Sequence, residues 1–322
     1  MKAIQVKRTG GPEVLELVDL PAPEPKAHEA LVKLGACGIN FIDVYQREGR
    51  YKVPLPFIAG QEGAGTIVAV GADVKSLKQG DRVAWTGVQG SYAEQAVVPA
   101  DRLVRVPDKV GDREAAAALL QGMTAQYLAY TTYPVRKGDT VLIHAAAGGV
   151  GLLLVQMCHH LGARVIGTVS TDEKARLARE AGADEVILYT RTDFEAETKR
   201  LTGGRGLNVV YDSVGKDTFE KGLNLLQVRG SMVLFGGSSG PVAPLDPMVL
   251  TAKGSLHLTR PSLAHYVAKR EELESRAAAV FGMIVAGDLK LRIEHTYPLA
   301  QAQQAHRDLE GRKTSGKLLL LP

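Results

Sequence analysis

A short glycine-rich segment, residues 145–151 with the sequence AAAGGVG, is the part of this chain best suited to bind a charged ligand. Gly148 and Gly151 fill the last two positions of a G-x-G-x-x-G pattern, and Ala146 takes the first. The segment follows an apolar strand pattern and opens a helix pattern. In that setting the backbone can approach a pyrophosphate closely, and the helix start supplies N–H donors. The segment therefore predicts a dinucleotide site, the alternative being a tight turn that binds nothing.

The residues after the next predicted strand indicate which dinucleotide is bound. A site for NAD usually places an acidic residue at the tip of this strand, where it binds the ribose 2′-hydroxyl. Here the strand ends without one, and Ser170 is followed by Lys174 on the next helix. A small polar residue with a nearby cation suits a 2′-phosphate, although Asp172 and Glu173 could repel it. We therefore expect NADPH as the cofactor, with Lys174 at its 2′-phosphate. The alternative for Lys174 is a solvated charge on the helix surface.

Two later strands also end in residues that could contact this cofactor. Tyr189 ends the third predicted strand and could stack on adenine or contact a phosphate, or could be a half-buried strand tyrosine. Phe235, Gly236 and Ser238 end another strand. Cofactors of open α/β sheets lie at such strand ends.

The composition excludes several other classes of protein. The chain has 322 residues, of which 45% are hydrophobic and 23% charged, and a net charge of +4. This near balance does not favour nucleic acid or an anionic membrane as a partner. The two cysteines, Cys37 and Cys158, make a disulfide framework or a four-cysteine zinc lobe improbable. The start of the chain lacks a signal peptide and no stretch suits a membrane span, so we expect a cytoplasmic protein.

The order of the predicted elements indicates two kinds of structure, and the length also favours two domains. Residues 1–120 contain short β patterns separated by Gly and Pro, at 14–19, 30–34, 65–70 and 82–85. From residue 140 onward strand and helix patterns alternate, which predicts a parallel α/β sheet. The expected strands are 140–144, 164–169, 186–189, 209–211 and 232–235, and the expected helices are 149–161 and 173–181. A helix at 270–285 and a strand at 317–321 follow.

The chain resembles, essentially end to end, the zinc-independent NADPH:quinone oxidoreductases, the ζ-crystallin-like branch of the medium-chain dehydrogenase/reductases. The similarity looks closest to the bacterial quinone oxidoreductases. The segments that carry it are 38–45 (GINFIDVY), 144–151 (HAAAGGVG), 210–215 (VYDSVG), and 254–256 with 259–263.

The resemblance implies a GroES-like, β-rich catalytic domain at residues 1–122 and 262–322, and a doubly wound Rossmann domain at 123–261. It implies that nicotinamide and quinone meet in the cleft between the domains, and that the chain forms a homodimer through its Rossmann sheets. Asn40 and Asp43 would lie beside the nicotinamide. The other residues implied to line the cofactor are Thr124, Gly148, Gly149, Val150, Ser170, Lys174, Tyr189, Ser213, Phe235 and Lys317.

The resemblance also implies that the catalytic zinc of related dehydrogenases is absent. Asn40 and Gln61 stand where that branch carries zinc ligands, and Glu62 alone does not hold a catalytic zinc. The adjacent His159 and His160 cannot face one ion together. Without a Lewis acid, alcohol oxidation lacks its usual support, whereas a quinone is easily reduced once it is positioned.

Hydrogen-bond donors near the quinone oxygens would stabilise the developing phenolate, and Asn40, Tyr45 and Tyr51 are candidates. The two tyrosines could equally be packing residues. The main alternative function is an NADPH-dependent enal or enone reductase, which acts on an activated C=C bond. A less expected function is an RNA-binding or structural protein that retains the nucleotide fold.

Overall fold

The computed structural model describes residues 1–322, which form two compact units. Unit 1 contains Met1–Met123 and Val267–Pro322, and unit 2 contains Thr124–Tyr266. The domain limits predicted above, 1–122 with 262–322 and 123–261, stay a prediction. No helix combines the length and the apolar character that crossing a membrane requires.

Unit 1 is built mainly of antiparallel strands. Its elements are β1 (Lys2–Val6), β2 (Glu16–Asp19), β3 (Glu29–Ile39), α1 (Phe41–Arg47), β4 (Phe57–Ile58), β5 (Glu62–Val70), β6 (Arg82–Thr86), β7 (Gln95–Pro99), β8 (Val104–Arg105), α2 (Asp112–Tyr127, whose end lies in unit 2), α9 (Arg270–Ala286), β15 (Ile293–Pro298), α10 (Ala302–Glu310) and β16 (Lys317–Leu321). Its larger sheet has the order β15-β16-β3-β5-β6-β8, with β7 paired to β3, and a small sheet has the order β2-β1-β4.

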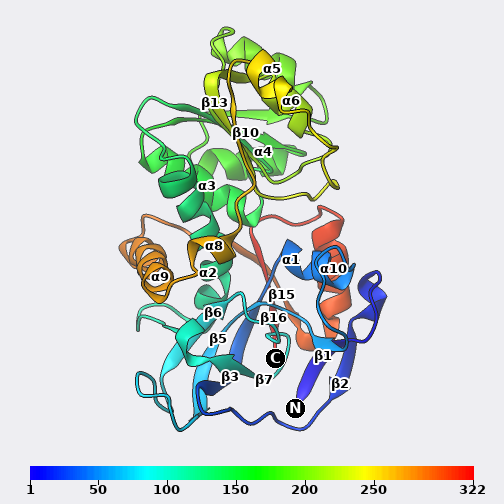
Figure 1. Ribbon diagram of the computed structural model, residues 1–322, viewed down its shortest axis with the longest axis vertical. Helices are drawn as coiled ribbons and strands as arrows, with labels where there is room; N and C mark the ends of the chain where they lie inside the picture. Colours follow the sequence, from blue (N-terminus) through cyan, green and yellow to red (C-terminus); the bar gives the residue numbers. More distant parts are fainter. The chain divides into compact units, whose positions relative to one another are not determined.

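Strand β3 organises the core of unit 1. Ala30, Val32 and Leu34 are buried at every second position, because successive side chains of a strand point to opposite faces. The final strand β16 pairs antiparallel with β3, so that Leu318 lies opposite Ile39. Figure 1 shows these two strands, from opposite ends of the colour range, side by side. The pairing brings the start of β16 to the end of β3, just before α1.

Unit 2 is a parallel sheet connected by helices. Its elements are β9 (Thr140–His144), α3 (Gly149–His160), β10 (Arg164–Val169), α4 (Asp172–Glu180), β11 (Glu185–Leu188), α5 (Phe194–Thr202), β12 (Leu207–Asp212), α6 (Phe219–Leu223), β13 (Leu226–Leu234), α7 (Met248–Ala252), β14 (His257–Thr259) and α8 (Leu263–Tyr266). All pairings in the sheet are parallel, and the strand order is β11-β10-β9-β12-β13-β14.

This order is the doubly wound arrangement in which the chain reverses direction along the sheet between β9 and β12. Val141, Leu142 and Ile143 of β9 are fully buried, as expected of a central parallel strand covered on both faces. The α/β fold class predicted from the sequence, a β-rich part and a Rossmann-type sheet, is confirmed. Ligands of such sheets bind beyond the carboxyl ends of the strands where the order reverses.

Candidate active site and cofactor site

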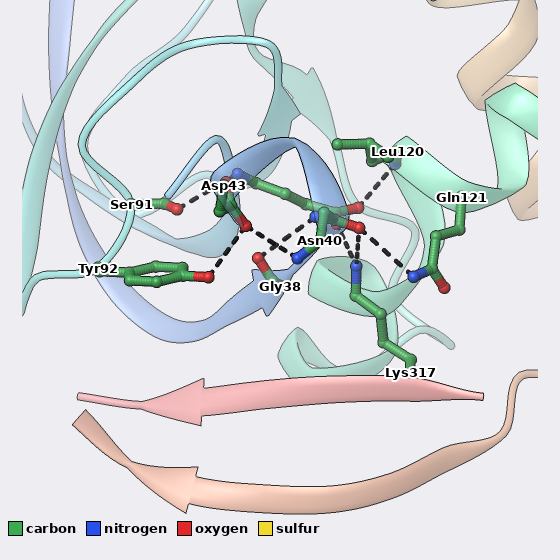
Figure 2. A network of polar contacts seen from close by, with 9 residues as sticks. Gly38, Asn40, Asp43, Ser91, Tyr92, Leu120, Gln121 and Lys317 are labelled. Carbon is green, nitrogen blue, oxygen red and sulfur yellow. Dashed lines mark hydrogen bonds and ion pairs between the residues drawn. The ribbon is translucent and has the colours of Figure 1, made fainter. Parts of the chain in front are cut away.

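A buried polar cluster at the start of α1 contains two of the predicted catalytic residues, Asn40 and Asp43 (Figure 2). The Asn40 side-chain amide donates to Glu62 Oε2 at 2.9 Å, and its oxygen accepts from Lys317 Nζ at 2.8 Å. Lys317 Nζ also forms an ion pair with Glu62 Oε2. The other oxygen of Glu62 accepts from the backbone N–H of Leu120 at 2.7 Å. Strands β3, β5 and β16 therefore place an amide, a carboxylate and an ammonium group in contact.

Asp43 connects this cluster to a second set of buried groups. Its Oδ2 accepts from the Asn40 backbone N–H at 2.8 Å and from the Tyr92 hydroxyl at 2.9 Å. Its Oδ1 is buried and has no hydrogen-bond partner. Burial raises the pKa of Asp43 to about 7, and this effect outweighs the two hydrogen bonds, which favour the carboxylate.

The predicted residues Tyr45 and Tyr51 form a separate aromatic group after Asn40. Their ring centroids lie 5.5 Å apart in an edge-on arrangement, and the Arg50 guanidinium lies 5.4 Å from the Tyr45 centroid. Tyr51 is 45% exposed. Tyr45 is half-buried, and the predicted role of the two rings toward a quinone stays a prediction.

In unit 2 the predicted glycine segment lies at the sheet's point of reversal. Gly148 is the N-cap of α3, and no side chain caps this helix start, so its N–H groups remain available for an anion. A Cβ on Gly151 would come within 2.2 Å of the Ala145 carbonyl oxygen. The role of Gly151 is therefore close packing of the helix on the preceding turn, while Gly149 and Val150 form the first turn of α3.

The ends of β12 and β13 bring four predicted cofactor residues together. The Phe235 N–H donates to the Asp212 carbonyl at 2.8 Å, and the Ser238 N–H donates to the Ser213 carbonyl at 3.2 Å. The buried Asp212 side chain accepts from the N–H groups that follow Ser213. Gly236 allows the two strand ends to approach, because a Cβ there would lie 2.5 Å from the Ser213 carbonyl oxygen.

The ends of β10 and β11 carry the residues predicted to meet a 2′-phosphate. The Thr190 hydroxyl donates to the Ser170 carbonyl at 2.9 Å, and the Lys174 backbone N–H donates to Thr171 at the start of α4. The Lys174 side chain is half-buried, and Tyr189 is 39% exposed. Asp172, which could repel a phosphate, forms a two-pronged ion pair with Arg191. Thr124, the remaining predicted residue, is buried near the end of α2.

Sequence reasoning missed Tyr92, His306 and Arg47, and treated Glu62 only as a lone carboxylate. Tyr92 and His306 are fully buried polar residues outside any recognisable motif. Arg47 was equally hidden, since a terminal helix arginine is usually exposed. No sequence signal identified them, because their partners are far away along the chain.

The donor set at the start of α1 does not suit zinc. The Asn40 amide is directed at Glu62, and the Gln61 amide donates to Gln89 Oε1 at 3.2 Å. Glu62 already has the Lys317 ammonium as its counter-charge. No group of three or more His, Cys, Asp or Glu side chains is placed to hold a metal ion anywhere in the chain.

Comparison with known proteins identifies the family. Residues 26–108 match the alcohol dehydrogenase GroES-like domain, and residues 149–274 match the family described as zinc-binding dehydrogenase. A quinone oxidoreductase of Pseudomonas aeruginosa is 47% identical over 100% of this chain and 99% of its own. A 2-haloacrylate reductase of a Burkholderia species is 39% identical over 99% of this chain and 98% of its own.

The solved structure of the Escherichia coli quinone oxidoreductase complexed with NADPH superimposes with a TM-score of 0.98. Its identity to this chain is 44%, and the match covers 100% of both chains. Similarity of this extent, over complete chains and in both units, shows that the chain belongs to the quinone oxidoreductase family.

Proposed function

We propose that this protein reduces quinones with NADPH and without a bound zinc ion. The observation that carries the proposal is the full-length likeness to a quinone oxidoreductase whose structure contains NADPH. Two features of unit 2 support a bound dinucleotide there. The start of α3 has no side-chain cap and lies where the strand order reverses between β9 and β12, and the strand ends at Ser213 and Phe235 lie close by. The donor set around Asn40 supports chemistry without zinc, since its amides and Glu62 are already engaged.

The proposed roles follow from the chemistry of each group. NADPH, when bound, supplies the hydride. The start of α3 would hold the pyrophosphate, and Ser170 and Lys174 the 2′-phosphate. In unit 1, Asn40, Tyr45 and Tyr51 would orient the quinone and donate hydrogen bonds to its reduced oxygens.

An assay that follows NADPH absorbance tests this function. The protein is given 1,2-naphthoquinone or a short enone, each with and without a metal chelator. We expect the quinone to be turned over faster, and the chelator to have no effect. Faster turnover of the enone would favour a C=C reductase, the second candidate, which the similarity to a 2-haloacrylate reductase supports. Loss of turnover with the chelator would contradict the zinc-free proposal.

Lys174→Ala is expected to weaken NADPH binding about tenfold and NADH binding by less than about twofold, because one charge-assisted contact to a phosphate is worth roughly 1.4 kcal/mol or more. Titration of both cofactors by intrinsic fluorescence measures the difference. Equal losses for the two cofactors would remove Lys174 from the phosphate site.

Arg191→Ala extends this test. It leaves the Asp172 carboxylate without its ion-pair partner at the start of α4, so NADPH binding should weaken and NADH binding should not. Arg200→Ala is the matched control, because Arg200 forms a similar exposed pair with Glu197 on α5. The control should bind both cofactors like the parent protein.

We further propose a homodimer formed through the edge strand β14. An edge strand presents unpaired backbone groups. Leu258 of β14 is 38% exposed, and Val228 of the neighbouring strand β13 is 70% exposed. A hollow of about 470 Å³ lined by Tyr133, Arg229, Ser231, His257 and Leu258 lies on the same edge. Light scattering should give twice the chain mass, and a monomer at all concentrations would contradict the proposal.

The two free, buried cysteines support a reducing, cytoplasmic location.

A further inference from the structure

A continuous line of buried hydrogen bonds runs from α10 to the start of α1. Arg47 Nη1 lies 3.1 Å from His306 Nδ1, His306 Nε2 lies 3.2 Å from the Tyr92 hydroxyl, and Tyr92 lies 2.9 Å from Asp43 Oδ2. Arg47, Tyr92 and His306 are at most 1% exposed. At the far end, Glu310 accepts two hydrogen bonds from the Arg47 guanidinium, at 2.9 and 2.7 Å. Of the four residues in this line, only Tyr92 contacts Asp43 directly, and none of them has a role in the function proposed for this protein.

The chemistry of Arg47 sets the direction of every hydrogen bond in this line. A guanidinium can only donate, so His306 Nδ1 must accept and the imidazole proton must lie on Nε2. That N–H donates to the Tyr92 oxygen, which leaves the single hydroxyl proton of Tyr92 for Asp43 Oδ2. Burial, assisted by the Arg47 charge, lowers the pKa of His306 to about 3, consistent with a neutral ring.

The same direction excludes a proton channel to the surface. A proton passed from His306 to Tyr92 and on to Asp43 would have to be replaced from Arg47, whose guanidinium does not release its proton in proteins. The line of hydrogen bonds therefore orients its side chains and does not conduct protons. Oδ2 of Asp43 is held as an acceptor, and the unpartnered Oδ1 is the atom that takes a proton when Asp43 is neutral.

We propose that His306 is a positioning residue for quinone reduction: through Tyr92 it holds Asp43 on the backbone N–H of Asn40, and so fixes the backbone from which the Asn40 side chain reaches Glu62 and Lys317. This inference rests on the proposed function. An ionised carboxylate is the stronger acceptor for both donors, so Asn40 is held most firmly when Asp43 carries its charge. Turnover should therefore decline as Asp43 becomes protonated.

Several charged or titratable groups face Asp43 and contribute to its ionisation. Lys317 on β16 favours the carboxylate, Glu62 on β5 opposes it, and the hydroxyl of Tyr92 stabilises it. Cys37 on β3 also lies close, and burial raises the pKa of its thiol, so it stays neutral. His306 acts only through Tyr92.

The test compares Tyr92→Phe, His306→Leu and His306→Gln in quinone turnover over a range of pH. Tyr92→Phe should lower kcat about tenfold near neutral pH, should leave KM for NADPH within about twofold, and should move the acidic limb of the profile up by about one pH unit, the size expected for one lost hydrogen bond to a charged group. His306→Leu should change kcat and the acidic limb in the same direction but by less, because the Tyr92 hydroxyl remains. Glutamine keeps one acceptor group and one donor group, as the neutral imidazole does, so His306→Gln should restore most of the activity.

Tyr297→Phe is the control, because it removes a tyrosine hydroxyl that donates to Asp308 outside this line. It should leave the pH profile unchanged. An unmoved limb in folded Tyr92→Phe and His306→Leu, or no recovery in His306→Gln, would overturn the proposal, since a merely structural role would lower stability without shifting the limb.

A second measurement does not depend on any substrate. Carbon-13 labelling of aspartate carboxyls, with the Asp43 signal identified by its loss in Asp43→Asn, gives the titration of Asp43 directly. Tyr92→Phe should move this titration up by about one unit. If quinone turnover were absent but the carboxyl titration shifted, the proposed function would fail while the hydrogen-bonded line would stand. An unshifted titration would refute the line itself.

Discussion

Lys317→Met is expected to lower the free energy of unfolding of unit 1 by about 3–5 kcal/mol, the range for removing one partner of a buried ion pair. Lys317 and Glu62 are 2% and 0% exposed. Methionine keeps the length of the side chain but leaves the Glu62 carboxylate with only the Asn40 amide and the Leu120 N–H as partners. Urea unfolding followed by the fluorescence of Trp85, the single tryptophan, which is buried in unit 1, measures the change.

The double variant Lys317→Met with Glu62→Gln is the decisive comparison. Lys317→Met alone leaves an uncompensated buried charge on Glu62, whereas the double variant leaves none, so the double variant should be more stable than Lys317→Met alone. Lys7→Met is the control, since Lys7 and Glu16 form an exposed pair worth at most about 1 kcal/mol. A Lys317→Met protein as stable as the parent would show that Glu62 is not held as a buried charge.

Asp43→Asn should change how stability depends on pH. Burial raises the pKa of Asp43 from 3.8 to about 7, so between these values the folded state binds more protons than the unfolded state. Stability then falls as pH rises through this window, by as much as about 4 kcal/mol in total. Asp43→Asn removes that loss, and its stability relative to the parent should rise between about pH 4.5 and 7.5.

His306 contributes to the pH dependence of stability with the opposite sign. Its pKa is lowered from 6.5 to about 3, so the folded state binds fewer protons in that window and stability falls as pH decreases. In the parent protein the two slopes oppose each other over much of the range, and Asp43→Asn should expose the His306 slope. Urea midpoints from Trp85 fluorescence at several pH values measure both. Asp108→Asn, at an exposed position, controls for the loss of one carboxylate. A constant difference between Asp43→Asn and the parent would contradict this prediction.

Most of the elements were predictable, because their patterns are local. The strands at 140–144, 164–169 and 317–321 were predicted with the bounds observed. The strand predicted at 14–19 begins only at Glu16, because Pro12 to Val14 form a 3₁₀ turn. The strands predicted at 186–189 and 232–235 end one residue earlier than expected, at Leu188 and Leu234, and the second of them begins at Leu226.

The sequence by itself determined the alternating strand and helix segments of unit 2, the glycine turn at Gly148 and the absence of an acidic residue at the tip of β10, because each depends on neighbours within a few residues. Only the tertiary structure decided that Lys317 meets Glu62 and that His306 reaches Asp43 through Tyr92. The Lys317–Glu62 and His306–Tyr92 contacts join residues more than two hundred positions apart. They form because β16 pairs with β3 and α10 packs in the same unit, where water is excluded and a buried charge is stabilised by a partner within the fold.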